Sequence, residues 1–222
     1  SFAMANQDWR HYLNGCLFEK TGSSINMVAT DAHRLAIYKS NLEGEGDFTG
    51  IVPRKTVIEL MKILPKQEDE IEFYINSNNI VFMSKKFTFK SKLIDGNYPN
   101  YNQVVPQGEG SKITFNRKNM LDSLSRVSVL TSEKFKGVKL KTESGVLDIS
   151  AHNPDQESAE EKLDVTSAGN EFDIAFNVNY LKEVLGTIDE EEISLISFGS
   201  DKSALVESGD SNQVLVLMPL LL

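Results

Sequence analysis

The chain has 222 residues, of which 40% are apolar and 25% charged, and its 32 acidic and 23 basic side chains give a formal net charge of −9. These values exclude a disordered chain and argue against a general nucleic-acid coat protein, which needs a basic surface. No run of about 18 apolar residues occurs, so we expect no membrane span. A single cysteine, Cys16, excludes an internal disulfide and a cysteine-rich metal site. Because the first residues also lack the basic and apolar regions of a signal peptide, we expect a cytoplasmic protein.

The first distinctive stretch is residues 6–15, "NQDWRHYLNG". Its amide, guanidinium, imidazole and aromatic groups form a mixture that contacts phosphates and bases in other proteins. A polar entry into a strand, with Trp9 and Tyr12 partly packed, explains the same residues equally well. This stretch alone leaves both interpretations open.

Residues 28–37, "VATDAHRLAI", place Asp31, His33 and Arg34 between apolar residues. A hydrolase centred on Asp31 and His33 would need a nucleophile with a positioned base and an oxyanion hole. The sequence has no G-x-S-x-G motif, and neighbouring residues on a strand or turn point in different directions. The stretch therefore favours a corner between two strands, in which Asp31 accepts hydrogen bonds from backbone N–H groups.

An internal repeat organises the chain, because residues 50–96 and 171–220 follow the same plan. Each segment begins with a short strand and a polar step, continues as a helix, and ends with an acidic loop and alternating strands. The apolar residues of the two expected helices recur at spacings of three and four: Val57, Leu60, Met61 and Leu64 in the first, and Tyr180, Leu181, Val184 and Leu185 in the second.

The second copy is preceded by an additional strand and helix in residues 112–130, where Leu121, Leu124, Val127 and Leu130 share one helical face. The first copy has no equivalent, so we expect a fragment whose first domain lacks its opening strand and helix. The sequence predicts an α+β fold of two similar domains, residues 1–106 and 107–222, each an antiparallel sheet backed by amphipathic helices. The boundary falls in residues 97–112, where prolines and glycines interrupt every period.

The last ten residues, "QVLVLMPLLL", continue an alternating strand into an apolar tail. Such a tail either packs into the core or borders a hydrophobic groove that binds a partner. The acidic runs "DEEE" and "QEDE" lack the ligand spacing of a calcium loop, and no glycine-rich phosphate loop opens a helix. We therefore expect no metal site and no cofactor.

Seven stretches together identify a family: "YLNGCLFE", "VATDAHRLA", "IVPRK", "SKLIDGNYPNY", "EKFKGVKL", "FNVNYL" and "MPLLL". In this order they resemble the bacterial sliding clamp, the beta subunit of DNA polymerase III, over essentially the whole chain. The resemblance covers the middle and C-terminal domains of that clamp. It implies a head-to-tail homodimeric ring around duplex DNA, with helices lining the hole and sheets on the outside. It also implies a non-catalytic processivity factor that tethers the replicative polymerase.

The resemblance further implies a hydrophobic pocket between the two domains. The pocket would bind short glutamine- and leucine-rich motifs of the DNA polymerase III alpha subunit, the clamp loader, other polymerases and repair proteins. Its residues would be Leu13, Thr30, Ala32, His33, Arg34, Leu35, Pro99, Gln103, Val104, Phe135, Asn177, Tyr180, Val216, Leu217, Met218, Pro219, Leu220, Leu221 and Leu222.

Three of these positions depart from the family pattern. Ala32 stands where glycine is frequent, so this corner should adopt a positive φ less readily. Gln103 replaces a common arginine, and Leu220-Leu221 replaces a frequent Met-Arg pair. The rim of the expected pocket is therefore less cationic and more apolar than in the family.

Two further sets follow from the resemblance. Gln7, Arg10, His11 and Tyr12 would touch template or single-stranded DNA. The dimer interface would use Val129, Leu130, Asp155, Glu157, Glu160 and Glu161 against a first domain that is absent here, so we expect that this chain cannot close the ring. A hydrolase at Asp31 and His33 and a protein-interaction domain without a DNA role remain the alternatives.

Overall fold

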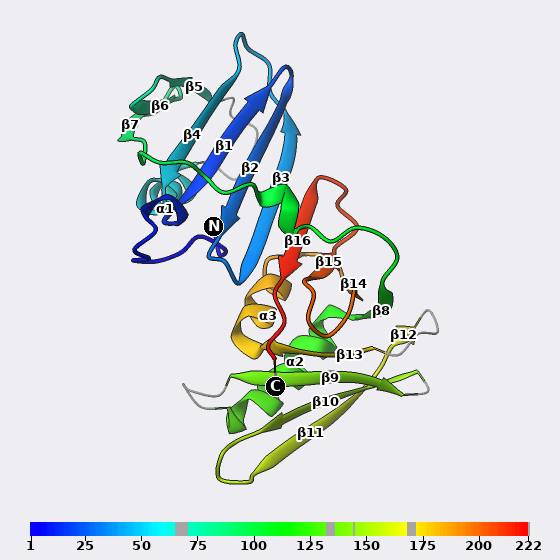
Figure 1. Cartoon of the computed structure of the whole chain (residues 1–222). Helices are drawn as coiled ribbons and strands as arrows, with labels where there is room; N and C mark the ends of the chain where they lie inside the picture. The colour runs from blue at the N-terminus through cyan, green and yellow to red at the C-terminus, as the bar shows by residue number, and fades with distance from the viewer. Residues whose placement is uncertain (65–70, 132–135, 144, 168–171, 222) are drawn as a thin grey trace. The chain divides into compact units, whose positions relative to one another are not determined.

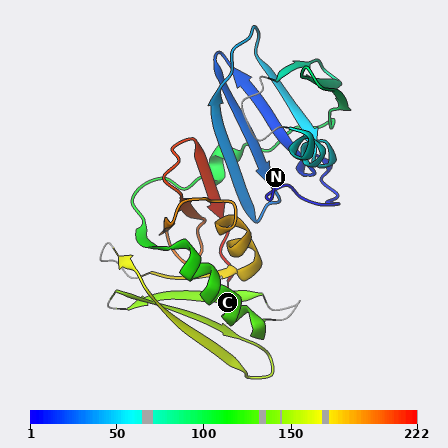
Figure 2. The same cartoon turned by 180° about the vertical axis from the view of Figure 1, so that it is seen from behind.

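A computed structural model describes residues 1–64, 71–131, 136–143, 145–167 and 172–221. The chain forms two compact units, Ser1–Tyr101 and Asn102–Leu222 (Figure 1). Each unit combines antiparallel sheets with a small number of helices, as both views show (Figures 1 and 2). The α+β class predicted from the sequence is confirmed.

The first unit begins with a short 3-10 turn, η1 (His11–Leu13), and contains a four-stranded antiparallel sheet in the order β4-β1-β2-β3. A second sheet has the order β5-β6-β7. The elements are β1 (Gly15–Thr21), β2 (Ser24–Thr30), β3 (Arg34–Asn41), β4 (Phe48–Pro53), α1 (Arg54–Ile63), β5 (Glu72–Ile75), β6 (Asn79–Met83) and β7 (Thr88–Lys92).

The helix α1 packs against β1 and β4 and buries Thr56 and Leu60. Since a helix turns by about 100° per residue, Met61 lies off this stripe and is 62% exposed, contrary to the expected apolar face. Aromatic rings join the two sheets of the unit: the ring centroids of Phe18 and Phe82 lie 6.5 Å apart, and those of Phe48 and Phe73 lie 5.6 Å apart. The core of the first unit therefore lies between α1 and both sheets.

One loop of this unit is held by a buried cation. The Lys20 side chain is buried, and its ammonium group donates to the carbonyl oxygens of Gly22 (2.5 Å), Gly44 (3.0 Å) and Gly46 (3.1 Å). Gly46 has a φ of +80°, a conformation that glycine adopts without strain. Two of these charge-assisted hydrogen bonds thus hold the loop between β3 and β4 against β1, and the third engages the turn between β1 and β2.

The second unit also contains two antiparallel sheets, in the orders β11-β10-β9-β13 and β12-β8-β14-β15-β16. The 3-10 turn η2 (Tyr101–Val104) leads into it. The elements are β8 (Ser111–Asn116), α2 (Arg117–Val127), η3 (Ser128–Leu130), β9 (Gly137–Glu143), β10 (Val146–His152), β11 (Ser158–Asp164), β12 (Thr166–Ser167), β13 (Asp173–Asn177), α3 (Val178–Leu185), β14 (Glu192–Ser197), β15 (Ala204–Glu207) and β16 (Gln213–Leu217).

Two helices cover the core of the second unit. The helix α2 packs against β10, β11 and α3, while α3 packs against β13 and β16. Leu124 and Val127 of α2 are buried as the spacing predicts, and so are Leu181, Val184 and Leu185 of α3. Burial of these stripes fixes both helices on the sheets.

The repeat is visible in the order of the elements. Apart from the short strand β12, the series β9-β10-β11-β13-α3-β14-β15-β16 repeats the series β1-β2-β3-β4-α1-β5-β6-β7, and the sheet β13-β9-β10-β11 matches the sheet β4-β1-β2-β3. The strand β8 and the helix α2 have no counterpart among the described residues of the first unit. The pattern read from the sequence is therefore the pattern of the fold.

Candidate functional site

The corner between β2 and β3 is held by its own polar side chains. Asp31 Oδ1 accepts hydrogen bonds from the backbone N–H groups of His33 (2.9 Å) and Arg34 (3.0 Å). The Thr30 hydroxyl donates to the carbonyl of Arg34 (2.7 Å) and accepts from the N–H of Ala32 (3.1 Å). The predicted role of Asp31 as an acceptor for backbone groups is confirmed.

The other carboxylate oxygen of Asp31 is also engaged. Asp31 Oδ2 accepts from Arg34 Nε at 3.0 Å, and the side chains of Arg34 and Asp31 are only 8% and 13% exposed. The Arg34 guanidinium carbon lies 5.4 Å from the centroid of the Phe2 ring. The Asp31 carboxylate holds two backbone N–H groups and a buried arginine, and this arrangement argues against a catalytic Asp31–His33 pair.

Ala32 occupies the tip of the corner with a φ of +73°. Alanine takes this conformation here despite the expected reluctance, because hydrogen bonds on both sides hold the chain. A left-handed conformation costs an alanine about 1–2 kcal/mol. The corner therefore stores local strain in an exposed residue.

The other predicted peptide-binding residues of the first unit are Leu13, Leu35 and Pro99. Leu35 follows on β3 and is buried, Leu13 is buried at the end of η1, and Pro99 is exposed after β7. The structure brings Thr30, Ala32, His33 and Arg34 together through the hydrogen bonds of the corner.

The loop of residues 6–14 is preorganised around Asp8. Arg10 donates to Asp8 through its backbone N (2.8 Å), Nε (3.0 Å) and a terminal guanidinium nitrogen (2.8 Å). Asn14 completes the loop, since its side chain exchanges two hydrogen bonds with the backbone of Asp8 at 2.9 and 2.8 Å. Hydrogen bonds from Arg10 are the main reason that the pKa of Asp8 is lowered to about 2.

All four predicted DNA-contacting residues, Gln7, Arg10, His11 and Tyr12, lie on this loop or on η1. The structure adds Trp9, which is 82% exposed with the Arg10 guanidinium carbon 5.7 Å from its ring centroid. The set predicted from the sequence omitted Trp9, which was considered only as a partly packed residue in one of the two interpretations; its position directly before Arg10 was the available signal. The loop thus presents an aromatic face beside an arginine whose charge is compensated by Asp8.

In the second unit, the predicted residues lie on η2, α3, β16 and the tail. Asn177 caps α3 by accepting from the N–H of Asn179 (3.0 Å), and Tyr180 is half-buried on the same helix. Gln103 is exposed and Val104 is half-buried on η2. Phe135 and Leu222 lie outside the described residues.

The apolar tail is partly packed and partly exposed. Val216 and Leu217 are buried on β16, and Met218, Pro219 and Leu220 are half-buried. The backbone N–H of Leu220 donates to the carbonyl of Ala175 on β13 at 2.8 Å, whereas Leu221 is 83% exposed. A hollow of about 520 Å³ lies beside the tail and is lined in part by Ile174, Ala175, Leu220 and Leu221.

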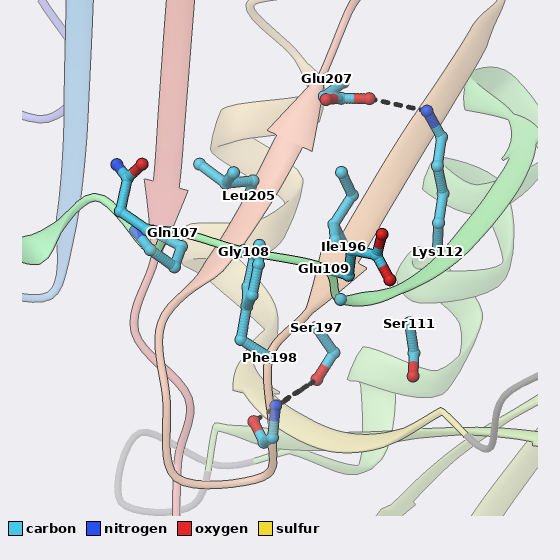
Figure 3. Close-up of a pocket in the computed structure, with 13 residues that line it drawn as sticks. Gln107, Gly108, Glu109, Ser111, Lys112, Ile196, Ser197, Phe198, Leu205 and Glu207 are labelled. Atoms are coloured by element: carbon cyan, nitrogen blue, oxygen red, sulfur yellow. Dashed lines mark hydrogen bonds and ion pairs between the residues drawn. The ribbon is translucent and has the colours of Figure 1, made fainter.

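A larger groove of about 700 Å³ lies within the second unit, lined by residues 106–112 and by side chains of β14 and β15 (Figure 3). Strand register pairs Ile196 with Lys112 on one side and with Leu205 on the other, and Leu205 with Val216. Leu205 at the groove is therefore the direct strand partner of Val216, a predicted peptide-binding residue. None of the residues that line the groove was predicted from the sequence to belong to a site. Lys112 closes one end through an ion pair with Glu207 at 2.7 Å.

The predicted dimer-interface residues lie on η3 and on the hairpin of β10 and β11. Val129 is 79% exposed and Leu130 is half-buried. Glu161 accepts from Arg126 Nε at 2.7 Å, and this contact lowers the pKa of Glu161. Asp155, Glu157 and Glu160 are exposed.

The structure describes residues 1–64, 71–131, 136–143, 145–167 and 172–221. No group of three histidine, cysteine, aspartate or glutamate side chains is placed to hold a metal ion there. None of the helices in that part is long and apolar enough to cross a membrane.

Comparison with known proteins assigns both units. Residues 1–100 match the family model of the DNA polymerase III beta subunit, central domain, and residues 102–221 match the model of its C-terminal domain. The chain is 40% identical over 223 residues to the beta sliding clamp of Pseudomonas aeruginosa, covering 99% of this chain and 61% of that protein. It is also 40% identical over 221 residues to the beta sliding clamp of Escherichia coli, covering 99% of this chain and 60% of that protein.

Solved structures agree with the family models. A crystal structure of the sliding clamp from Pseudomonas aeruginosa with a ligand gives a TM-score of 0.95 at 40% identity, covering 100% of this chain and 61% of that one. A crystal structure of the same clamp bound to griselimycin gives the same TM-score, identity and coverage. This chain thus spans about three fifths of the length of the relatives it matches.

Replacing Ala32 by glycine should stabilise the protein by up to about 1.6 kcal/mol. Glycine removes about 1–2 kcal/mol of strain from the left-handed conformation. It also lowers the stability by about 0.4–1 kcal/mol, because glycine raises the entropy of the unfolded chain. Urea unfolding measures the difference. The matched control is Ala36→Gly on β3, where glycine should destabilise the strand; a loss of stability in Ala32→Gly would contradict the role given to the positive φ.

The Asp8–Arg10 pair predicts an acid-sensitive loop. The folded-state pKa of Asp8, about 2, lies below the ordinary value of 3.8, so the stabilising contact is complete above pH 4 and is lost as the pH falls through about 2. Carbon-13 NMR titration of the Asp8 carboxyl group measures this pKa directly. Arg10→Met should raise it towards 3.8, and a wild-type pKa near 3.8 would rule out the pairing.

Proposed function

The chain belongs to the DNA polymerase III beta subunit family, the beta sliding clamps, and on that premise we propose that it supplies two domains of a processivity factor. Such a factor encircles duplex DNA as a ring and tethers the replicative polymerase to it. The observation that carries this proposal is the match of both family models, in order, over residues 1–100 and 102–221. The TM-score of 0.95 to a solved sliding clamp supports it.

The proposed ring is a homodimer of the longer protein and holds DNA without reading its sequence. Its contacts between protomers would include Val129, Leu130, Asp155, Glu157, Glu160 and Glu161. Gln7, Arg10, His11 and Tyr12 would touch DNA from the loop around Asp8, together with the exposed Trp9. A single cysteine and the proposed role in replication favour the cytoplasm.

We propose that the residues of the corner and of the apolar tail bind short glutamine- and leucine-rich motifs. The proteins that carry such motifs would be the DNA polymerase III alpha subunit, the clamp loader, other polymerases and repair proteins. Met218, Pro219 and Leu220 are half-buried and supply apolar surface, and the exposed His33 supplies a hydrogen-bonding group. Burial of two leucine-sized anchors contributes about 3–6 kcal/mol before the cost of ordering the peptide. Micromolar affinity, about 8 kcal/mol, therefore requires that the other contacts of the motif add to this burial.

A non-catalytic role also follows from the corner itself. Both carboxylate oxygens of Asp31 are held by Arg34 and by backbone N–H groups. A general base must instead be placed to take a proton from a nucleophile or water. Asp31 is therefore not placed for the proton transfer that a hydrolase needs. The remaining alternative function is that of a protein-interaction domain with no DNA role.

A peptide titration tests the binding residues. Fluorescence anisotropy of a labelled Gln-Leu pentapeptide should give a micromolar Kd with the wild type and a Kd at least about tenfold weaker with Met218→Asp, because a buried carboxylate opposes apolar contact. Met61→Asp is the matched control on an exposed methionine of α1 and should bind as the wild type does. Equal affinity of Met218→Asp and the wild type would refute the assignment.

A topological experiment tests the ring. The longer protein that contains this chain, placed on nicked circular duplex DNA by a clamp loader, should stay bound through gel filtration and leave after a restriction enzyme cuts the circle. Encirclement predicts this difference, because a closed ring dissociates over a free end. Equal release from circular and linear DNA would favour an interaction domain without a DNA role.

A further inference from the structure

Tyr98 lies where the pairing of β1 with β2 has ended. The β1–β2 register runs from Thr21↔Ser24 to Leu17↔Val28, whereas β2 continues to Thr30 and stays paired with β3. The Tyr98 hydroxyl donates to the carbonyl of Val28 at 3.3 Å and accepts from the N–H of Thr30 at 3.1 Å. One hydroxyl, acting as both donor and acceptor, thus engages two β2 groups at the end of the strand.

The hydroxyl is a neutral group at any pH the protein meets. Burial is the main cause that raises the pKa of Tyr98 well above its ordinary value of 10.0. The ring is half-buried, so solvent competes weakly for the two hydrogen bonds. The two hydrogen bonds of Tyr98 therefore connect the segment after β7 stably to the end of β2.

Thr30 connects Tyr98 to the corner between β2 and β3. The backbone of Thr30 is held by Tyr98, and its side chain holds the carbonyl of Arg34 and the N–H of Ala32. Pro99 follows Tyr98 directly in the chain. One side chain therefore fixes two separate parts of the proposed peptide-binding set, the corner and Pro99.

A second tyrosine ties the same segment at a different place. The Tyr101 hydroxyl donates to Glu19 Oε2 at 2.6 Å and accepts from Asn26 Nδ2 at 3.3 Å. These partners lie in the middle of β1 and β2, away from the corner. Tyr101 thus anchors the segment without engaging Thr30, and it serves as an internal control for Tyr98.

We propose that Tyr98 is a positioning residue of the peptide-binding site: its hydroxyl holds the corner and Pro99 in one arrangement before a peptide arrives. This inference rests on the proposed function of those residues. Preorganisation raises affinity because the free protein no longer loses conformational entropy when it binds. Tyr98→Phe keeps the ring and removes both hydrogen bonds, which leaves the Thr30 N–H and the Val28 carbonyl without this partner.

The experiment compares three tyrosine-to-phenylalanine variants with the wild type. Tyr98→Phe should weaken the Gln-Leu pentapeptide about three- to tenfold, the range of one net hydrogen bond. It should also speed hydrogen exchange at the amides of Thr30 and Ala32 in the free protein. Tyr101→Phe should lower stability to urea and leave both readouts unchanged. Tyr74→Phe, an exposed tyrosine on β5, should change nothing.

The outcomes separate the two proposals. If Tyr98→Phe binds the peptide with wild-type affinity, or if hydrogen exchange at Thr30 is unchanged, the positioning role is overturned. This holds even if the stability falls, because a purely structural contact would change only the stability. Absence of peptide binding by the wild type overturns the proposed binding site, and the inference with it. Were Tyr98→Phe to fold poorly, Tyr98→His would test the same contact, with an imidazole that retains one hydrogen bond. Tyr98→His should bind the peptide more weakly than the wild type and Tyr101→Phe do. Its amide hydrogen exchange at Thr30 should also be faster than in those two proteins. Affinity equal to the wild type in Tyr98→His with fast exchange at Thr30 would also overturn the proposal.

Discussion

Each α-helix of the described chain starts at the residue after a strand ends, and both units depend on this direct junction of strand and helix. β4 ends at Pro53, β8 at Asn116 and β13 at Asn177, and the helices start one residue later. Without a loop, a helix must turn back onto the sheet it has just left, so its apolar stripe and one sheet face are buried together. Asn116 and Asn177 stabilise the joints by accepting from backbone N–H groups of the first turn.

The helices cover one side of the sheets, and the residues proposed to bind peptides include those of a corner between two strands. At the corner of β2 and β3, the polar atoms of Thr30 and Asp31 satisfy the backbone of the corner itself. Such a network fixes shape and leaves no carboxylate placed for proton transfer. The same residue types that first suggested an acid-base site therefore build a rigid edge, and rigidity is what a binding surface needs.

The sequence predicted whatever depends on neighbours along the chain. Helical spacing identified Leu124, Val127, Leu181 and Val184 as buried, and the chemistry of Asp31 predicted the corner. Contacts between residues far apart in the chain could not be predicted from the sequence. Tyr98 and Thr30 are 68 positions apart, and Lys20 binds carbonyl groups 24 and 26 positions away. Likewise, the positive φ of Ala32 and the exposure of Trp9 and Met61 are set by tertiary packing, which local spacing does not encode.

Charge and shape together explain how the proposed clamp would hold DNA without sticking to it. A net charge of −9 disfavours phosphates overall, and Asp8 compensates Arg10 on the loop proposed to touch DNA. Binding by neutralisation of phosphates releases counterions and becomes tighter with each unpaired cation, which would slow movement along the duplex. A compensated arginine beside an exposed tryptophan gives a contact with little net charge. Retention would then come from closure of the ring, and the contacts could stay weak enough for sliding.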